Sequence, residues 1–144
     1  MRDPDSLWLD LVNRYAKQSK CRSRVVGAIL VDKHNHCFGQ GYNSAPYGSS
    51  TDQCARCDNK TPSGVDLSLA LCSHAEANAI GNAVRAGRST EGATLYCTLY
   101  PCSECAKLVV AAGIVEVVYD QWYNSPLTEM IFKNANVKVR KFHA

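Results

Sequence analysis

Apolar residues near the N-terminus recur at the spacing of an amphipathic helix. The positions are Leu7, Leu11, Val12 and Tyr15, and the preceding pair Asp5-Ser6 is suited to capping a helix. We expect this helix over residues 6–19. The pattern then changes to two short extended runs, 25–31 and 37–42, with a hairpin turn at 33–35.

The second half of the chain alternates between helical and extended patterns. We expect helices over 73–86, 102–112 and 126–134, and strands over 93–98, 114–119 and 137–139. Gly87 and Gly113 are suited to ending the first two of these helices, Ser73 to capping the first, and Pro101 to starting the second. This order predicts a layered α/β domain with a five-stranded mixed sheet, formed by residues 1–144 as one unit.

A loop over residues 43–66 interrupts the pattern and is rich in Gly, Pro, Ser, Asn and Asp. An ordered loop of this length in a compact domain usually has a function or is held by something other than apolar burial.

Composition and charge narrow the possible classes of protein. The 16 basic and 13 acidic residues leave a net charge of +3, so the sequence has no polybasic arm and implies no general affinity for nucleic acid. No apolar run approaches the roughly 20 residues of a membrane span. The charged N-terminal segment MRDPDSLWLD is unlike a signal peptide. We therefore expect a cytoplasmic protein without a membrane partner.

The 8 cysteines among 144 residues are too sparse for a secreted disulfide scaffold. Clustered cysteines in a chain without an export signal usually bind metal or take part in catalysis. Two Cys-x-x-Cys pairs stand out, Cys54/Cys57 and Cys102/Cys105.

Two short motifs stand at the predicted starts of neighbouring helices. His74-Ala75-Glu76 opens one, and Pro101-Cys102-Ser103-Glu104-Cys105 opens the next. Spacing of three residues places both sulfurs of the second motif on one helical face. His74, Cys102 and Cys105 are three zinc ligands that leave a fourth position for water, as in catalytic rather than structural sites. Glu76 is then free to transfer protons. The alternative is an ordinary helix surface beside a redox-active or structural cysteine pair.

H-x-E followed by P-C-x-x-C is the signature of the zinc-dependent nucleobase deaminases, and further segments narrow the resemblance. The matching segments are Cys21–Ala28, Gly41–Pro46, His74–Ile80, Leu95–Cys105 and Tyr119–Tyr123. With them the chain resembles the deoxycytidylate (dCMP) deaminases of the cytidine deaminase superfamily over nearly its whole length. Ser44 and Tyr100 depart from the common pattern of that family. The resemblance implies a three-layer α/β/α sandwich of the cytidine deaminase type.

The resemblance also implies a reaction and a set of substrate contacts. A zinc-activated hydroxide attacks C4 of cytosine, Glu76 protonates N3, and ammonia leaves to give dUMP, a precursor for thymidylate synthesis. Asn43 matches a residue that holds the sugar hydroxyl, Ala75 would offer its N–H to the base carbonyl, and Tyr123 matches a tyrosine that lies against the nucleotide. Asn43 as a plain turn residue and Tyr123 as a core aromatic are the alternatives.

Phosphate recognition and regulation rest on weaker signals. Ser23 and Arg24 lie in a basic stretch suited to a phosphate, although most such stretches are merely solvated. The resemblance implies activation by dCTP with Mg²⁺, inhibition by dTTP, and a homo-oligomer, with a hexamer favoured. It places the effector site between subunits, at the loop that holds Tyr42 and Pro46, and makes Arg85 an interface or effector residue.

We predict a second, structural zinc ion for the remaining cysteine cluster. Cys54 and Cys57 have zinc-knuckle spacing, Cys72 lies two residues before His74, and Cys21 immediately precedes an extended segment. Several members of the resembled family carry a comparable second zinc. The alternatives are free thiols or a disulfide, which a reducing compartment disfavours.

Two other functions remain open from the sequence. One is another deaminase of the superfamily, acting on tRNA adenosine or a free cytidine-type substrate. The other is an inactive zinc- or nucleotide-binding module, which would have no use for Glu76.

Overall fold

The computed structural model describes residues 4–62, 65 and 69–143. Its helices are α1 (Pro4–Ala16), α2 (Ala55–Asp58), α3 (Ala75–Arg85), α4 (Ser103–Ala111) and α5 (Pro126–Asn134). Its strands are β1 (Gly27–Val31), β2 (Cys37–Tyr42), β3 (Thr94–Leu99), β4 (Glu116–Gln121) and β5 (Lys138–Lys141). The five strands form one sheet in the order β2-β1-β3-β4-β5. β1 is antiparallel to both of its neighbours, whereas β3, β4 and β5 run parallel.

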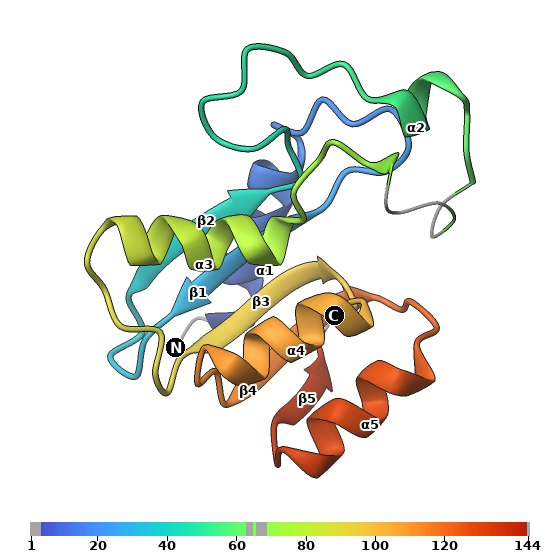
Figure 1. Ribbon diagram of the computed structural model, residues 1–144. Coiled ribbons are helices and arrows are strands. Elements are labelled where there is room, and N and C mark those ends of the chain that lie inside the picture. The colour runs from blue at the N-terminus through green and yellow to red at the C-terminus, as the bar shows by residue number, and fades with distance from the viewer. Residues whose placement is uncertain (1–3, 63–64, 66–68, 144) are drawn as a thin grey trace.

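Alternate residues of the strands face two separate cores, as the two-residue period of a strand requires. On one face, Leu30, Leu95 and Val117 pack with residues of α3, α4 and α5. On the other face, Ile29, Tyr96 and Val118 pack against α1 and Phe142. Figure 1 shows α3 and α4 in front of the sheet and α1 behind it. The predicted three-layer α/β/α sandwich with a five-stranded mixed sheet is confirmed.

Most predicted elements are present, with ends that differ by a few residues. The strand over 37–42 and the helix over 126–134 have the predicted bounds, while the first helix begins at Pro4 and ends at Ala16 rather than spanning 6–19. The short helix α2, inside the loop over 43–66, was not predicted. It has only four residues, too few for a periodic pattern. Within the described residues, no helix has the length and apolar character needed to cross a bilayer.

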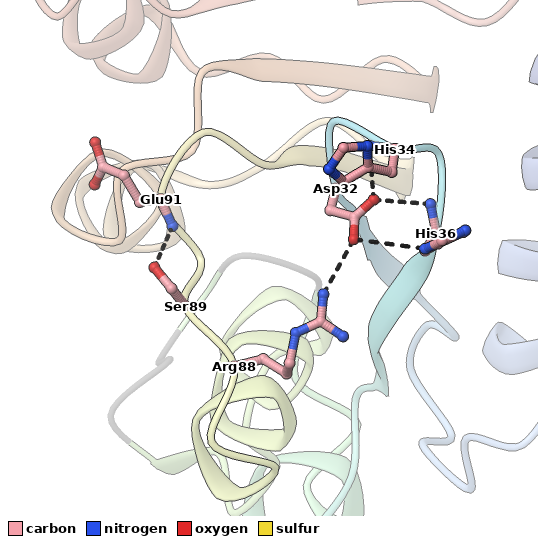
Figure 2. A network of polar contacts seen from close by, with 6 residues as sticks. All are labelled: Asp32, His34, His36, Arg88, Ser89 and Glu91. Carbon is pink, nitrogen blue, oxygen red and sulfur yellow. Dashed lines mark hydrogen bonds and ion pairs between the residues drawn. The ribbon is translucent and has the colours of Figure 1, made fainter.

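The predicted hairpin turn between β1 and β2 is held by a single carboxylate. Asp32 accepts hydrogen bonds from the backbone N–H of His34 at 2.9 Å and of His36 at 3.0 Å, and it also pairs with Arg88 at 3.0 Å (Figure 2). Asn35 adopts a positive φ of 65°, which asparagine tolerates better than most residues. This network lies at the end of β1 and β2 that is remote from Gly27 and the loop after Tyr42.

A buried ion pair joins the first helix to the last strand. Asp5 of α1 is 3% exposed and accepts two hydrogen bonds from the Arg140 guanidinium, at 2.6 and 3.0 Å. These hydrogen bonds hold the pKa of the Asp5 carboxyl below its ordinary value. Asp5 therefore stabilises the fold above the ordinary carboxyl pKa of about 3.9, and this stabilisation is lost as the pH falls through the lowered pKa.

We expect Arg140→Met to lower the free energy of unfolding by about 2 kcal/mol at neutral pH, because it removes the guanidinium that pairs with the buried Asp5 carboxylate. The difference from wild type should shrink as the pH falls below about 4. Urea unfolding at several pH values measures both effects. Lys138→Met is the control, since Lys138 is 73% exposed in its ion pair with Glu116, and such pairs contribute at most about 1 kcal/mol. Equal losses in the two variants would contradict the proposed role of burial.

Candidate active site

Close packing between α3 and β2 positions the first motif. A Cβ atom at Gly41 would lie 2.5 Å from the backbone oxygen of Ala75 and 2.5 Å from the backbone nitrogen of Ala79, so only glycine lets the helix lie this near the strand. Asn78 of α3 donates a hydrogen bond to the backbone oxygen of Tyr42 at 2.8 Å. The first turn of α3 is thereby fixed against the end of β2.

His74 is the N-cap residue of α3, which corrects the prediction that Ser73 caps this helix. Ser73 instead exchanges two backbone hydrogen bonds with Ser44, at 2.7 and 3.1 Å, and this pairing keeps it outside the helix. The extended backbone of His74 and the helical position of Glu76 turn both side chains toward the same cavity. Two residues that would diverge in mid-helix therefore face one site.

The second motif has the same arrangement at the start of α4. Cys102 is the N-cap residue and Cys105 lies in the first turn, while the fully buried Pro101 precedes the helix. The backbone oxygen of Pro101 accepts a hydrogen bond from the buried Thr128 hydroxyl of α5 at 3.0 Å. Helix α5 thus holds the segment that carries the cysteines.

The three predicted ligands meet at metal-binding distances. Nδ1 of His74 lies 3.3 Å from Sγ of Cys105 and 3.5 Å from Sγ of Cys102. All three ligand atoms lie within 4.8 Å of one another, and this is the one such group among the described residues. A tetrahedral zinc ion with ordinary bond lengths would place its nitrogen and sulfur ligands about 3.5 Å apart. The residues therefore fit zinc, with one coordination position left for a small molecule.

The charges at this site suit a cation. The hydrogen bond from Cys105 and the neighbouring His74 lower the pKa of the Cys102 thiol to about 4. The hydrogen bond with Cys102 raises the pKa of His74. Glu76 is 4% exposed, and burial raises the pKa of its carboxyl. A buried carboxyl group with a raised pKa, beside a metal site, is well suited to accept and return a proton.

A cavity of about 120 Å³ opens over this group. It is lined by every residue that was predicted to contact substrate, namely Ser23, Arg24, Asn43, Ala75 and Tyr123. Tyr100, a departure from the family pattern that was expected to alter the shape of the pocket, also lines it, as do Arg56 and Leu99, which were not predicted. Arg56 stands inside the Cys54/Cys57 pair, so its position between two candidate metal ligands was the available signal.

Asn43 has a clear structural role in addition to its place in the cavity. Its side chain accepts a hydrogen bond from the backbone N–H of Val26 at 2.8 Å and donates one to the backbone oxygen of Arg24 at 2.7 Å. Asn43 therefore joins the end of β2 to the segment before β1. Each end of an amide can make a further hydrogen bond, so these contacts leave capacity for a ligand.

Tyr100, one of the departures from the family pattern, belongs to an aromatic cluster beside the cavity. Its ring is 3% exposed and lies 4.5 Å from Trp122 and 5.1 Å from Tyr119, measured between ring centroids. Burial raises the pKa of the Tyr100 hydroxyl to about 12. Tyr100 thus forms a neutral wall of the cavity at ordinary pH.

The four cysteines predicted to hold a second zinc, Cys21, Cys54, Cys57 and Cys72, form no disulfide, and among the described residues the structure does not bring them together as a metal-sized ligand group. The sulfurs of Cys21 and Cys57 are 4.0 Å apart. Backbone N–H groups also donate hydrogen bonds to the sulfur of Cys54. The one from Leu71 is the largest cause that lowers the pKa of this thiol to about 7. Burial, followed by the charges of the other three cysteines, raises the pKa of Cys72 to about 11.

Two of the three predicted effector residues line a second, larger cavity of about 540 Å³. Tyr42 and Pro46 line it, together with Tyr47 and the cysteine cluster. Arg85 does not line this cavity. Its guanidinium instead lies 3.7 Å from the centroid of the Tyr47 ring, in a cation–π contact.

One histidine and two cysteines at the starts of two helices can hold a zinc ion and leave one coordination position open. A buried carboxyl group lies beside them. This combination is typical of zinc-dependent hydrolases of the deaminase class. Residues 2–121 match the family model described as the cytidine and deoxycytidylate deaminase zinc-binding region. The chain belongs to this family.

Curated relatives support the same assignment. The chain is 39% identical over 135 residues to the deoxycytidylate deaminase of Mus musculus, an alignment that covers 88% of this chain and 72% of the relative. It is 36% identical over 144 residues to the deoxycytidylate deaminase of Schizosaccharomyces pombe, covering 96% of this chain. The chain spans only 44% of the length of that yeast relative.

Solved structures show the same fold. The dCMP deaminase of the cyanophage S-TIM5, in complex with dCMP and dUMP, matches with a TM-score of 0.81 and 26% identity over 98% of this chain and 99% of that one. A structure from a study of tRNA:A34 deaminases matches with a TM-score of 0.63 and 21% identity, a likeness that extends to the fold alone.

Proposed function

We propose that this protein hydrolyses dCMP to dUMP and ammonia. The observation that carries the proposal is the buried Glu76 facing the same cavity as the His74, Cys102 and Cys105 ligand group. The choice of dCMP is supported by the names of the curated relatives and by the nucleotides bound in the cyanophage structure.

The metal ligands and Glu76 have different roles in the proposed reaction. A zinc ion held by His74 and the two cysteines would supply Lewis-acid activation of a water molecule at neutral pH. Glu76 is placed to accept a proton in the cavity, to deliver it to N3 of the cytosine ring and to protonate the leaving amino group, which departs as ammonia. Burial of Glu76 keeps bulk water from competing for these proton transfers.

We assign substrate recognition to the predicted residues that line the cavity. The backbone N–H of Ala75 faces the base carbonyl, Asn43 holds the sugar hydroxyl, and Tyr123 lies against the nucleotide. Ser23 and Arg24, both exposed at the mouth of the cavity, contact the phosphate. Their common location in one cavity supports this division.

A substrate panel tests the proposed function. We expect zinc-loaded protein to release ammonia from dCMP with a kcat/KM at least about 100-fold above those for cytidine and deoxycytidine, because charge-assisted phosphate contacts contribute about 1.5–3 kcal/mol each. CMP tests whether the enzyme prefers deoxyribose to ribose, and dCTP tests whether it prefers one phosphate group to three. Turnover of a tRNA anticodon stem or a free nucleoside in preference to dCMP would contradict the proposal, as would bound zinc without any turnover.

We further propose regulation by dCTP with Mg²⁺ as activator and dTTP as inhibitor, which suits an enzyme that supplies dUMP for thymidylate synthesis. The large cavity at Tyr42 and Pro46 supports a nucleotide effector site, with Arg85 reaching that loop through Tyr47. Kinetics that are cooperative in dCMP, and hyperbolic once dCTP and Mg²⁺ are added, would agree with this assignment.

We propose a second, structural zinc held by Cys21, Cys54, Cys57 and Cys72. Burial and, after it, the charges of the other three sulfurs raise the pKa of Cys72, and a bound cation would offset both effects. The 4.0 Å between Cys21 and Cys57 is close to the roughly 3.8 Å between sulfurs of a tetrahedral zinc site. Backbone N–H groups directed at the sulfurs are further support, since such contacts orient metal ligands.

We also propose that the protein forms a homo-oligomer, with a hexamer favoured by family resemblance. We place the protein in the cytoplasm with nucleotide ligands and no nucleic-acid partner, in keeping with its small net charge.

A further inference from the structure

Arg56 occupies an unusual position for a charged residue. It stands in the middle of α2, between Cys54 and Cys57, and only 7% of its surface is exposed. It also lines the same cavity as His74 and Tyr123. A side chain of the cysteine loop, which lies far from the catalytic motifs in sequence, therefore reaches the candidate active site.

The contacts of Arg56 fix its guanidinium without neutralising it. Nε donates to the backbone oxygen of Val65 at 2.7 Å, and Nη2 donates to the backbone oxygen of Pro62 at 2.6 Å. Among the described residues, Nη1 makes no hydrogen bond and no carboxylate pairs with Arg56. Among the described residues the guanidinium therefore has no acidic partner, and its remaining N–H donors are available to an anionic ligand.

Arg56 is the buried one of the two arginines that line this cavity. By contrast, Arg24 of the same cavity is exposed, and water screens its charge. Arg56 is thus the buried, pre-oriented cation of this cavity.

We propose that Arg56 binds the phosphate of the nucleotide substrate and determines the preference for a nucleotide over a nucleoside. This inference rests on the proposed deamination of dCMP. The base and sugar of that substrate are neutral, so the phosphate is its only group that matches a buried guanidinium. A guanidinium also presents its N–H donors in a plane that suits two phosphate oxygens.

Arg56 shares the short helix α2 with Cys57, and Cys54 is the N-cap residue of that helix. A shift of α2 would therefore displace the guanidinium together with these two cysteines.

The test compares dCMP with deoxycytidine in Arg56→Gln. We expect the KM for dCMP to rise about 10- to 100-fold, as for loss of a charge-assisted hydrogen bond, while kcat changes little. The kcat/KM for deoxycytidine should stay within about threefold of wild type. Inorganic phosphate, used as a competitive inhibitor of deoxycytidine turnover, should lose potency by a similar factor.

Arg88→Gln is the matched control, because it removes the same charge at the hairpin network of Figure 2, remote from the cavity. It should leave the ratio between the two substrates unchanged. Arg56→Lys keeps the charge and should recover part of the dCMP affinity. If Arg56→Gln does not fold, Arg56→Lys is compared with wild type in its place.

The outcomes separate this inference from the function on which it rests. Equal losses for dCMP and deoxycytidine in the Arg56 variants would show that Arg56 only supports its loop, and would overturn the inference. Wild-type protein without any preference for dCMP would overturn the proposed function instead.

Discussion

Replacing Glu76 with glutamine is expected to lower kcat by about 100- to 10,000-fold, the usual contribution of a general acid–base group. Glutamine has nearly the same shape and fills the same buried position, but it cannot take or return a proton. The zinc content should stay at the wild-type level, because the ligands are His74, Cys102 and Cys105. Steady-state kinetics and metal analysis of the same preparation measure both quantities.

Glu104→Gln provides the control for this experiment. Glu104 lies in the first turn of α4, between the two cysteine ligands, yet its side chain is 77% exposed and pairs with Lys107. The substitution removes the same charge near the site without touching the cavity, so kcat should stay within about twofold. Activity of Glu76→Gln within tenfold of wild type, or loss of its zinc, would contradict the assignment.

Replacing Cys54 with serine is expected to lower the zinc content from about two ions per chain to about one. Cys54 is buried, and the loop around it contains few apolar side chains, so a metal would contribute much of the stability of this region. Structural zinc sites contribute on the order of 10 kcal/mol to the folding of small domains. Here the sheet and its helices remain, and we expect the unfolding midpoint to fall by about 10 °C.

Cys37→Ser is the control for the cysteine cluster. Cys37 lies half-buried on β2, where its sulfur contacts Gly39 and Gln40 rather than the other cysteines. Two zinc ions per chain should remain in that variant. One zinc ion per wild-type chain, with Cys21, Cys54, Cys57 and Cys72 freely alkylated under native conditions, would contradict the second site.

Local patterns predicted most of the secondary structure because each signal depends on near neighbours in the chain. The turn at 33–35, the glycines after α3 and α4, and Pro101 before α4 act within one or two residues. The prediction failed at Ser73, because the backbone pairing with Ser44 comes from a segment about thirty residues away.

The active-site ligands were predictable for a related reason. Zinc chemistry restricts the ligands to a few residue types, and helix starts restrict their spacing, so His74, Glu76, Cys102 and Cys105 stand out in the sequence. The structure brings these residues together by packing α3 and α4 side by side on the sheet, as Figure 1 shows.

The order of elements, the class of fold and the metal-binding motifs could all be predicted from the order of residues along the chain. The other side chains that share the cavity could be identified only from the folded structure. Arg56 lies in a loop without periodicity, and its burial depends on the backbone oxygens of Pro62 and Val65 in the same loop and on a cavity wall formed by distant segments. Tyr100 likewise becomes a wall through contacts with Trp122 and Tyr119. Such contacts form only when the chain folds, because no local pattern encodes the distance between residues far apart in sequence.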